Sequence, residues 1–203
     1  MPPPTPLKRL SGFLNRRPAP RSLVALYLSV RFRCLVSPAA KIDYPLSVRI
    51  GRGSRIGACH FIARSGQIEI GADCEVQDGV VIDTQEGQVR IGDQCRIGSY
   101  TILYGLGGIV VGAQSSIAAH SMIVASSHSF KGRKIPIRDQ ASTAKGISIG
   151  RDVWIGANCV VIDGATIGQG CVIGAASVVR GNVEAFAVAV GCPARVIRVR
   201  EDA

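Results

Sequence analysis

The side chains of this chain best suited to proton transfer are its three histidines, His60, His120 and His128. A neutral imidazole can take the proton of a hydroxyl group as that hydroxyl attacks an electrophile. We expect His128, in the stretch Ala125 to Phe130, to act as such a base; the alternative is a loop histidine that only packs. His120 is expected either to line the same groove or to be structural.

The histidine positions argue against a metal centre. If the chain winds into stacked coils, we expect His60 at an inward position of the first coil and His120 three coils later, about 14 Å away at the strand spacing of ~4.8 Å. Two side chains so far apart cannot bind one metal ion. The seven cysteines form no Cys-x-x-Cys pair, so a zinc ribbon or a redox motif is not supported either. The expected metal complement is none.

The element that must position these side chains is a six-residue repeat, which holds eighteen aliphatic residues in six groups of three. A short fixed period predicts a solenoid, in which each repeat buries its apolar side by stacking on its neighbours. Each group of three then forms one triangular coil of short strands. The positions are Ile50, Ile56, Ile62; Ile70, Val76, Ile82; Ile91, Ile97, Leu103; Val111, Ile117, Ile123; Ile149, Ile155, Val161; and Ile167, Ile173, Val179.

All the insertions in this pattern fall at one corner. The steps from the third position of one group to the first of the next are 8, 9, 8, 26, 6 and 6 residues. Insertions at one edge of a solenoid usually mark its working face. The longest begins after Ile123, ends near Ile147 and contains His128. A loop of this length is usually functional or disordered, and this position favours catalysis for His128.

The first 42 residues hold eight basic residues and no acidic one. Within them, Leu23 to Val36 can form a helix with one apolar side. Its longest run of apolar residues is too short to span a bilayer. One interpretation is a cap on the N-terminal end of the solenoid. The other is peripheral attachment to anionic lipid. No recognition motif accompanies the charge, so we expect no nucleic acid partner. Met1 to Pro6 is expected to lack fixed structure.

Four cysteines occupy the small inward position of the hexapeptide: Cys74, Cys95, Cys159 and Cys171. They are interpreted as small buried hydrophobic residues. Reduced thiols fit the cytosol. We therefore expect a cytoplasmic protein, with peripheral contact at the inner face of the membrane as the open alternative.

Repeats, loop and tail together resemble the left-handed β-helix, or hexapeptide-repeat, acyltransferases. The chain is most similar to O-acetyltransferases of bacterial polysaccharide and lipopolysaccharide synthesis, and to maltose and galactoside acetyltransferases. The likeness covers about residues 49 to 200. It is most specific from His128 to Ile155, including Asp152-Val153-Trp154-Ile155-Gly156, and in Gly191-Cys192-Pro193-Ala194-Arg195.

The resemblance implies an all-β fold, a left-handed parallel β-helix of about six triangular coils. A basic, partly helical extension would occupy residues 1–48. The β-helix would occupy 49–184, with a long loop at 129–146 inserted after coil four. A C-terminal tail would occupy 185–203.

The same resemblance implies acetyl-CoA as co-substrate and direct transfer of acetyl to a hydroxyl of a sugar or glycan, with His128 as general base. It also implies a homotrimer whose active sites lie between subunits. Residues matched to the binding of CoA are Ala157, Ala175, Arg180 and Arg195, where Arg180 stands near the position of a family lysine. Residues expected to contact the acceptor are Trp154, His120 and Tyr104.

Two other functions remain open. One is acetyl transfer to a different small acceptor, namely serine, an amino sugar nitrogen or a xenobiotic. The other is a non-catalytic trimeric scaffold. The intact motifs around His128 and Trp154, with the Pro-Ala-Arg tail, favour an enzyme over a scaffold.

Overall fold

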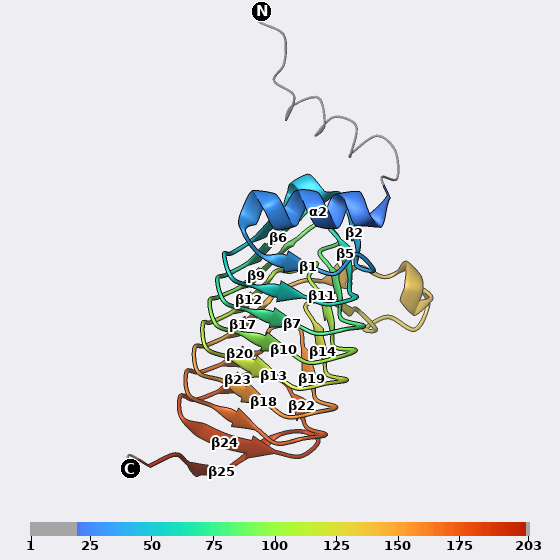
Figure 1. Ribbon diagram of the computed structural model, residues 1–203. Helices are drawn as coiled ribbons and strands as arrows, with labels where there is room; N and C mark the ends of the chain where they lie inside the picture. The colour runs from blue at the N-terminus through green and yellow to red at the C-terminus, as the bar shows by residue number, and fades with distance from the viewer. Residues whose placement is uncertain (1–19, 202–203) are drawn as a thin grey trace, which may run out of the picture.

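The computed structural model describes residues 20–201, which form a three-sided β-helix built from stacked short strands (Figure 1). The chain runs through sheet A, sheet B and sheet C in turn, and the coils wind left-handed. Sheet A contains β1 (Leu35–Val36), β4 (Arg55–Ile56), β7 (Glu75–Val76), β10 (Arg96–Ile97), β13 (Ser116–Ile117), β18 (Trp154–Ile155), β21 (Val172–Ile173), β24 (Ala187–Val190) and β25 (Arg195–Val199).

The other two sheets each have seven strands, all parallel. Sheet B contains β2 (Lys41–Asp43), β5 (His60–Ile62), β8 (Val81–Asp83), β11 (Ile102–Tyr104), β14 (Met122–Val124), β19 (Val160–Ile162) and β22 (Val178–Val179). Sheet C contains β3 (Val48–Ile50), β6 (Gln67–Ile70), β9 (Gln88–Ile91), β12 (Ile109–Val111), β17 (Ile147–Ile149), β20 (Thr166–Ile167) and β23 (Asn182–Val183).

The aliphatic repeat forms the core, because alternate residues of each short strand point into the prism. Every position of the repeat is buried except Ile62, where the inward residue is Phe61 instead. The turn before β5 is one residue shorter than its counterparts, so the register places Phe61 beside Ile82. A one-residue slip moves each side chain to the other face of a strand. His60 therefore points outward, which corrects the inward position expected from the repeat.

The β-helix starts earlier than residue 49. Strands β1 and β2 pair with β4 and β5, and the short helix η1 (Pro45–Ser47) fills the next corner. The helix predicted from Leu23 to Val36 is shorter than expected. It is α2 (Arg21–Phe32), and Arg33 ends it in the left-handed conformation at φ 53°. Val36, which the prediction placed in the helix, lies in sheet A.

Helix α2 lies across the N-terminal end of the prism (Figure 1) and buries Val24, Ala25 and Leu28 against the first coil. This is the capping contact that the sequence suggested. Met1 to Pro6, expected to lack fixed structure, lies outside the described residues. At the opposite end, β25 pairs antiparallel with β24 and closes sheet A.

The four cysteines assigned to inward positions are buried, and their thiols donate to backbone carbonyls of neighbouring coils. Cys59 is a further buried cysteine. Burial raises the pKa of its thiol to about 12. Such thiols are poor nucleophiles at neutral pH. In the part of the chain that the structure describes, no helix is long and apolar enough to cross a membrane.

Candidate active site

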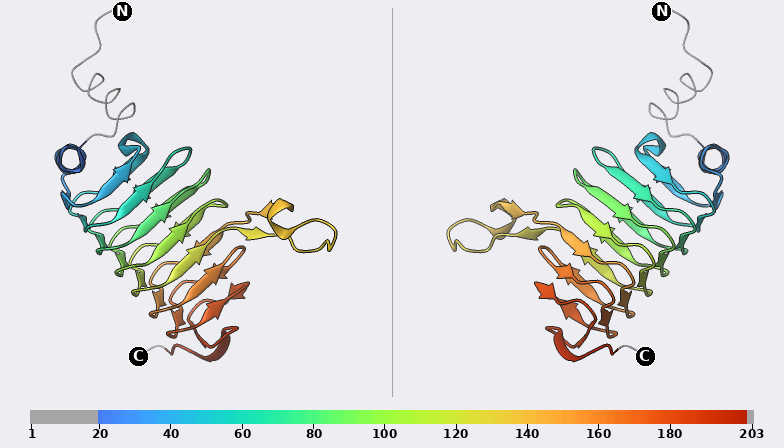
Figure 2. Two further views of the ribbon diagram at one scale, coloured as in Figure 1. Left: turned by 90° about the vertical axis from the view of Figure 1, so that its right-hand side faces the viewer. Right: turned by 90° about the vertical axis from the view of Figure 1, so that its left-hand side faces the viewer.

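His128 lies on a hairpin that projects from the side of the prism (Figure 2). The hairpin pairs β15 (Ser127–His128) antiparallel with β16 (Ser142–Thr143), and η2 (Ile137–Asp139) lies near its tip. His128 stands directly opposite Ser142, and its Nδ1 is 3.4 Å from the hydroxyl oxygen of that serine. Both side chains are exposed, so a substrate can reach the imidazole.

The hairpin leaves the prism at the corner between sheet B and sheet C, here called the B–C edge. Beside it is an open pocket of about 590 Å³. The pocket is lined by corner residues of successive coils and by the hairpin: Arg64, Ser65, Gln85, Glu86, Leu106, Ser126, His128 and Ser142. Charged, amide and hydroxyl groups thus surround the imidazole, a lining that suits a polar acceptor rather than an apolar one.

The base of the hairpin is held by Asp163, which the sequence analysis did not single out. Its Oδ1 accepts the backbone N–H groups of Lys145 at 2.7 Å and Gly146 at 2.9 Å. Its Oδ2 accepts the hydroxyl of Thr143 at 3.3 Å, and Thr143 is the neighbour of Ser142. Asp163 therefore ties the strand opposite His128 to the next coil. No local pattern reveals this role, because Asp163 lies in an ordinary turn.

Gly107 explains how the two ends of the insertion fit on one corner. Its backbone N–H donates to Ala125 O at 2.9 Å, where the insertion leaves the prism. A Cβ atom at Gly107 would lie 2.5 Å from Gly146 N, where the insertion returns. Only glycine permits such a close backbone approach. The glycine-rich turn after Tyr104 thus accommodates the hairpin, while Tyr104 itself ends β11 beside this edge.

Several predicted residues lie away from His128 in the single chain. Ala157, Ala175 and His120 occupy successive turns between sheet A and sheet B, here called the A–B edge. His120 stacks on Tyr100, with ring centroids 5.3 Å apart. Trp154 is more than half exposed on the outer face of sheet A.

The two arginines also separate. Arg180 is exposed on the B–C edge of the last coil. Arg195 follows a turn in which Ala194 N–H donates to Val178 O at 2.8 Å, close to the A–B edge. The matched CoA residues are thus divided between two edges of the prism, and sheet B lies between those edges.

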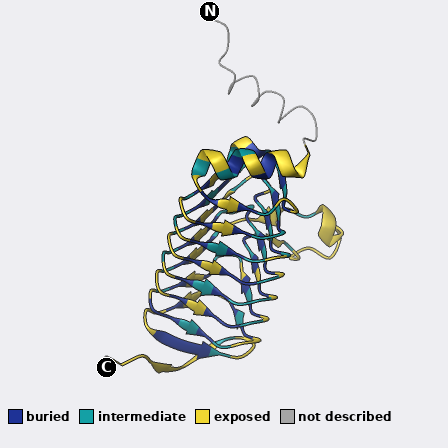
Figure 3. Ribbon diagram, viewed as in Figure 1, coloured by how far each residue is buried: buried dark blue, intermediate teal, exposed yellow. Residues whose placement is uncertain are grey.

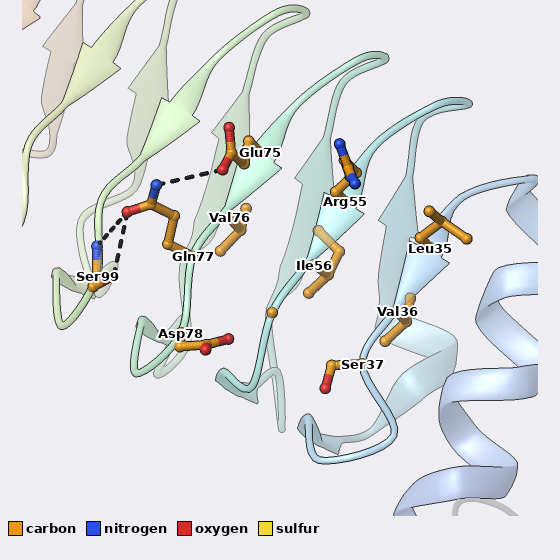
Figure 4. Close-up of a pocket in the computed structure, with 11 residues that line it drawn as sticks. Leu35, Val36, Ser37, Arg55, Ile56, Glu75, Val76, Gln77, Asp78 and Ser99 are labelled. Carbon is orange, nitrogen blue, oxygen red and sulfur yellow. Dashed lines mark hydrogen bonds between the residues drawn. The ribbon is translucent and has the colours of Figure 1, made fainter.

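A second open pocket lies on the outer face of sheet A near the N-terminal end (Figure 4). Several of its polar side chains bond to one another or to backbone. Gln77 accepts from the backbone N–H and hydroxyl of Ser99 and donates to Glu75, while Asp78 accepts from Ala58 N–H. No histidine lines this pocket, so the site around His128 is the better candidate for chemistry.

In residues 20–201, no three side chains of His, Cys, Asp or Glu gather closely enough to hold a metal ion. His60, which the structure turns outward, bonds through Nε2 to Asp43 at 3.0 Å. That contact gives His60 a structural partner on the neighbouring coil.

Comparisons with known proteins agree with this architecture. The family model for the bacterial transferase hexapeptide (six repeats) matches residues 146–181, and that for the hexapeptide repeat of succinyl-transferase matches residues 88–123. The putative colanic acid biosynthesis acetyltransferase WcaF of Escherichia coli is 34% identical over 140 residues, which are 69% of this chain and 74% of that protein. A probable acetyltransferase of Mycobacterium tuberculosis is 34% identical over 187 residues, 92% of this chain; the match spans 60% of that relative.

Two solved structures share the fold. AntD, an N-acyltransferase from Bacillus cereus in complex with dTDP-4-amino-4,6-dideoxyglucose and coenzyme A, superposes with a TM-score of 0.63 at 25% identity, covering 83% of this chain and 81% of that one. A Vibrio cholerae hexapeptide-repeat acetyltransferase complexed with acetyl-CoA gives 0.52 at 25% identity, covering 96% and 85%.

The three-sided β-helix of hexapeptide repeats is shared with these solved acyltransferases. Two relatives at least 30% identical and matched over 74% of their own length are named as putative acetyltransferases. The chain belongs to the hexapeptide-repeat acetyltransferase family.

Proposed function

We propose that this protein transfers an acetyl group from acetyl-CoA to a hydroxyl of a sugar or glycan precursor, with His128 as the general base. The observation that carries the proposal is the position of His128, exposed on the hairpin beside a polar pocket. Relatives that are named for lipopolysaccharide and colanic acid biosynthesis also support the proposal.

For this reaction, one ring nitrogen of the histidine must accept the substrate proton while the other holds the ring in place through a hydrogen bond. If Nδ1 of His128 donates its proton to Ser142 Oγ, Nε2 is left as the acceptor for the proton of a sugar hydroxyl. That hydroxyl then attacks the thioester carbon, and the thiolate of CoA leaves. Among the pocket residues, Gln85, Glu86 and Ser65 supply donors and acceptors for sugar hydroxyls, while Arg64 can pair with an acceptor phosphate.

The A–B edge at the C-terminal end suits the pantetheine arm of CoA. Ala157 is half-buried and Ala175 exposed on successive turns, so small side chains leave the backbone accessible there. The two coils that carry these alanines are in close backbone contact. A Cβ atom added to Gly156 would lie 2.6 Å from Ala175 N. Arg195 is exposed near the same edge and offers a guanidinium for the phosphates.

A complete site requires both edges, and a trimer can join them. If three parallel prisms turn sheet B toward a common axis, the A–B edge of one subunit meets the B–C edge of the next. The outer face of sheet B carries a continuous apolar row on five coils, as such an interface needs. The row is Val81, Ile102, Met122, Val160 and Val178. His128 of one chain would then act with CoA held by its neighbour.

The trimer gives the first prediction. Light scattering of the wild-type protein at micromolar concentration should give a mass near three times 21.3 kDa. Ile102→Asp with Val160→Asp should give monomers without acetyl transfer, because two charges would enter the apolar row. Val110→Asp, a matched change at an exposed apolar residue of sheet C, should remain trimeric. A fully active monomer would overturn the arrangement.

Asp163 gives the second prediction. Asp163→Ala leaves the N–H groups of Lys145 and Gly146 without their partner and should lower kcat/KM about 10-fold, because small displacements of a catalytic group slow transfer strongly. Asp163→Asn keeps an acceptor oxygen and should restore most of the rate. Asp139→Ala, an acidic residue of the same insertion that pairs only with Arg138, serves as control and should be silent. If all three variants have the same kcat/KM, Asp163 does not position the strand opposite His128.

A second candidate function is transfer to an amino sugar nitrogen. An Escherichia coli dTDP-4-amino-4,6-dideoxy-D-glucose acyltransferase is 30% identical over 66% of this chain and 72% of that protein. AntD also carries an amino sugar nucleotide in its complex. Incubation of the purified protein with labelled acetyl-CoA and matched hydroxyl and amino nucleotide sugars tests both. Failure to label any sugar acceptor, with acetyl-CoA bound, would contradict the proposed function.

A further inference from the structure

Helix α2 has two apolar faces, and the cap uses only one of them. Val24, Ala25 and Leu28 are buried against the first coil. On the opposite side, three aliphatic side chains are exposed to 53%, 60% and 72%: Leu23, Leu26 and Val30. At 100° per residue, the mean direction of this second set lies about 180° from that of the first. The exposed set, here called the outer stripe, therefore points away from the β-helix.

The outer stripe is not needed for the cap. The next exposed aliphatic residue along the chain, Leu35, begins β1 at the same end of the prism and is 65% exposed. Exposed residues occur along α2 at the N-terminal end of the prism (Figure 3). An aliphatic row of this kind on a capping helix indicates a surface with a partner.

The charge around the outer stripe identifies the kind of partner. Arg31 and Arg33 are exposed in or directly after α2, whereas Arg21, also exposed, points to the side of the helix opposite the outer stripe at 100° per residue. The first 42 residues carry eight basic and no acidic side chains, and the first acidic residue, Asp43, is paired with Lys41 and His60. A partner must therefore offer an apolar interior next to negative charge.

We propose that the outer stripe docks the protein on an anionic lipid bilayer, with α2 lying in the interface. Leucine and valine side chains enter the acyl boundary while arginines contact lipid phosphates, as in other interfacial helices. A second protein surface would need acidic groups matched to these arginines, whereas an anionic bilayer supplies apolar depth and negative charge together. If the proposed parallel trimer forms, three α2 helices lie at one end and bind jointly.

Vesicle sedimentation of the full chain tests the docking without reference to acetyl transfer, so its failure leaves the proposed function untouched. We expect binding to vesicles of phosphatidylcholine with 30% phosphatidylglycerol at 0.1 M salt, and little binding to pure phosphatidylcholine. At 1 M salt, where screening shortens to ~3 Å, binding should be largely lost. No binding to the anionic vesicles, or equal binding to both compositions, overturns the proposal.

The aliphatic contribution is tested by Leu23→Ser, Leu26→Ser and Val30→Ser made together. We expect partitioning on the anionic vesicles to fall at least ~10-fold, because interfacial helices bind through buried apolar area. The matched control is Val196→Ser with Ile197→Ser, exposed aliphatics on β25 at the far end, which should bind like wild type. Unchanged binding of the triple variant, or equal loss in the control, shows that the outer stripe is not the contact.

Discussion

The His128→Ala variant is expected to lose nearly all acetyl transfer, by about 10²–10⁴-fold in kcat, because a general base contributes rates of that order. Binding of acetyl-CoA and the midpoint of thermal unfolding should stay unchanged, since His128 is exposed and its side chain has one long contact, to Ser142. Steady-state kinetics, calorimetric titration with acetyl-CoA and thermal melts measure the three quantities.

His120→Ala is the matched histidine control. His120 is also exposed, but it lies on the A–B edge and stacks on Tyr100, so its loss should be milder. If His128→Ala keeps more than half of the wild-type rate, His128 is not the base. An equally large loss for His120→Ala would mean that both histidines act at one site across the subunit interface.

Phe61→Ala is expected to have the largest effect on stability. Phe61 is fully buried and is the largest such side chain in the prism. Its truncation should lower the free energy of unfolding by about 3–5 kcal/mol, because transfer and cavity costs add. Urea unfolding at equal protein concentration measures the change.

The matched control for the core is Phe130→Ala on the hairpin, where the side chain is 75% exposed. The same chemical change there should alter stability by less than ~0.5 kcal/mol. If Phe61→Ala unfolds like wild type, the register that turns Phe61 inward and His60 outward is wrong. In that case Ile62 would be the buried residue of β5.

The six-residue period was enough to predict the β-helix, because stacking coils bury the same strand position each time. It misplaced Ile62, since the shorter turn before β5 shifts the register without changing residue types. It also missed β1 and β2. Val36 and Ile42 continue the period, but they lie inside a basic segment whose apolar spacing also suits a helix.

The candidate site was less predictable than the fold. His128 could be located because it stands in the one long insertion, and the structure places it beside a polar pocket. The role of Asp163 depends on contacts with residues 17 to 20 positions away, and such contacts leave no local pattern. Sequence motifs also do not show that Ala157 and Ala175 occupy a different edge from His128.

The most direct test of the proposed chemistry is the bond formed in the product. Labelled acetyl from acetyl-CoA should appear on a sugar acceptor as an ester, which alkaline hydroxylamine cleaves. The label should be absent from the product of His128→Ala. A hydroxylamine-resistant amide would show transfer to nitrogen, and wild-type levels of label with His128→Ala would contradict the account of the site.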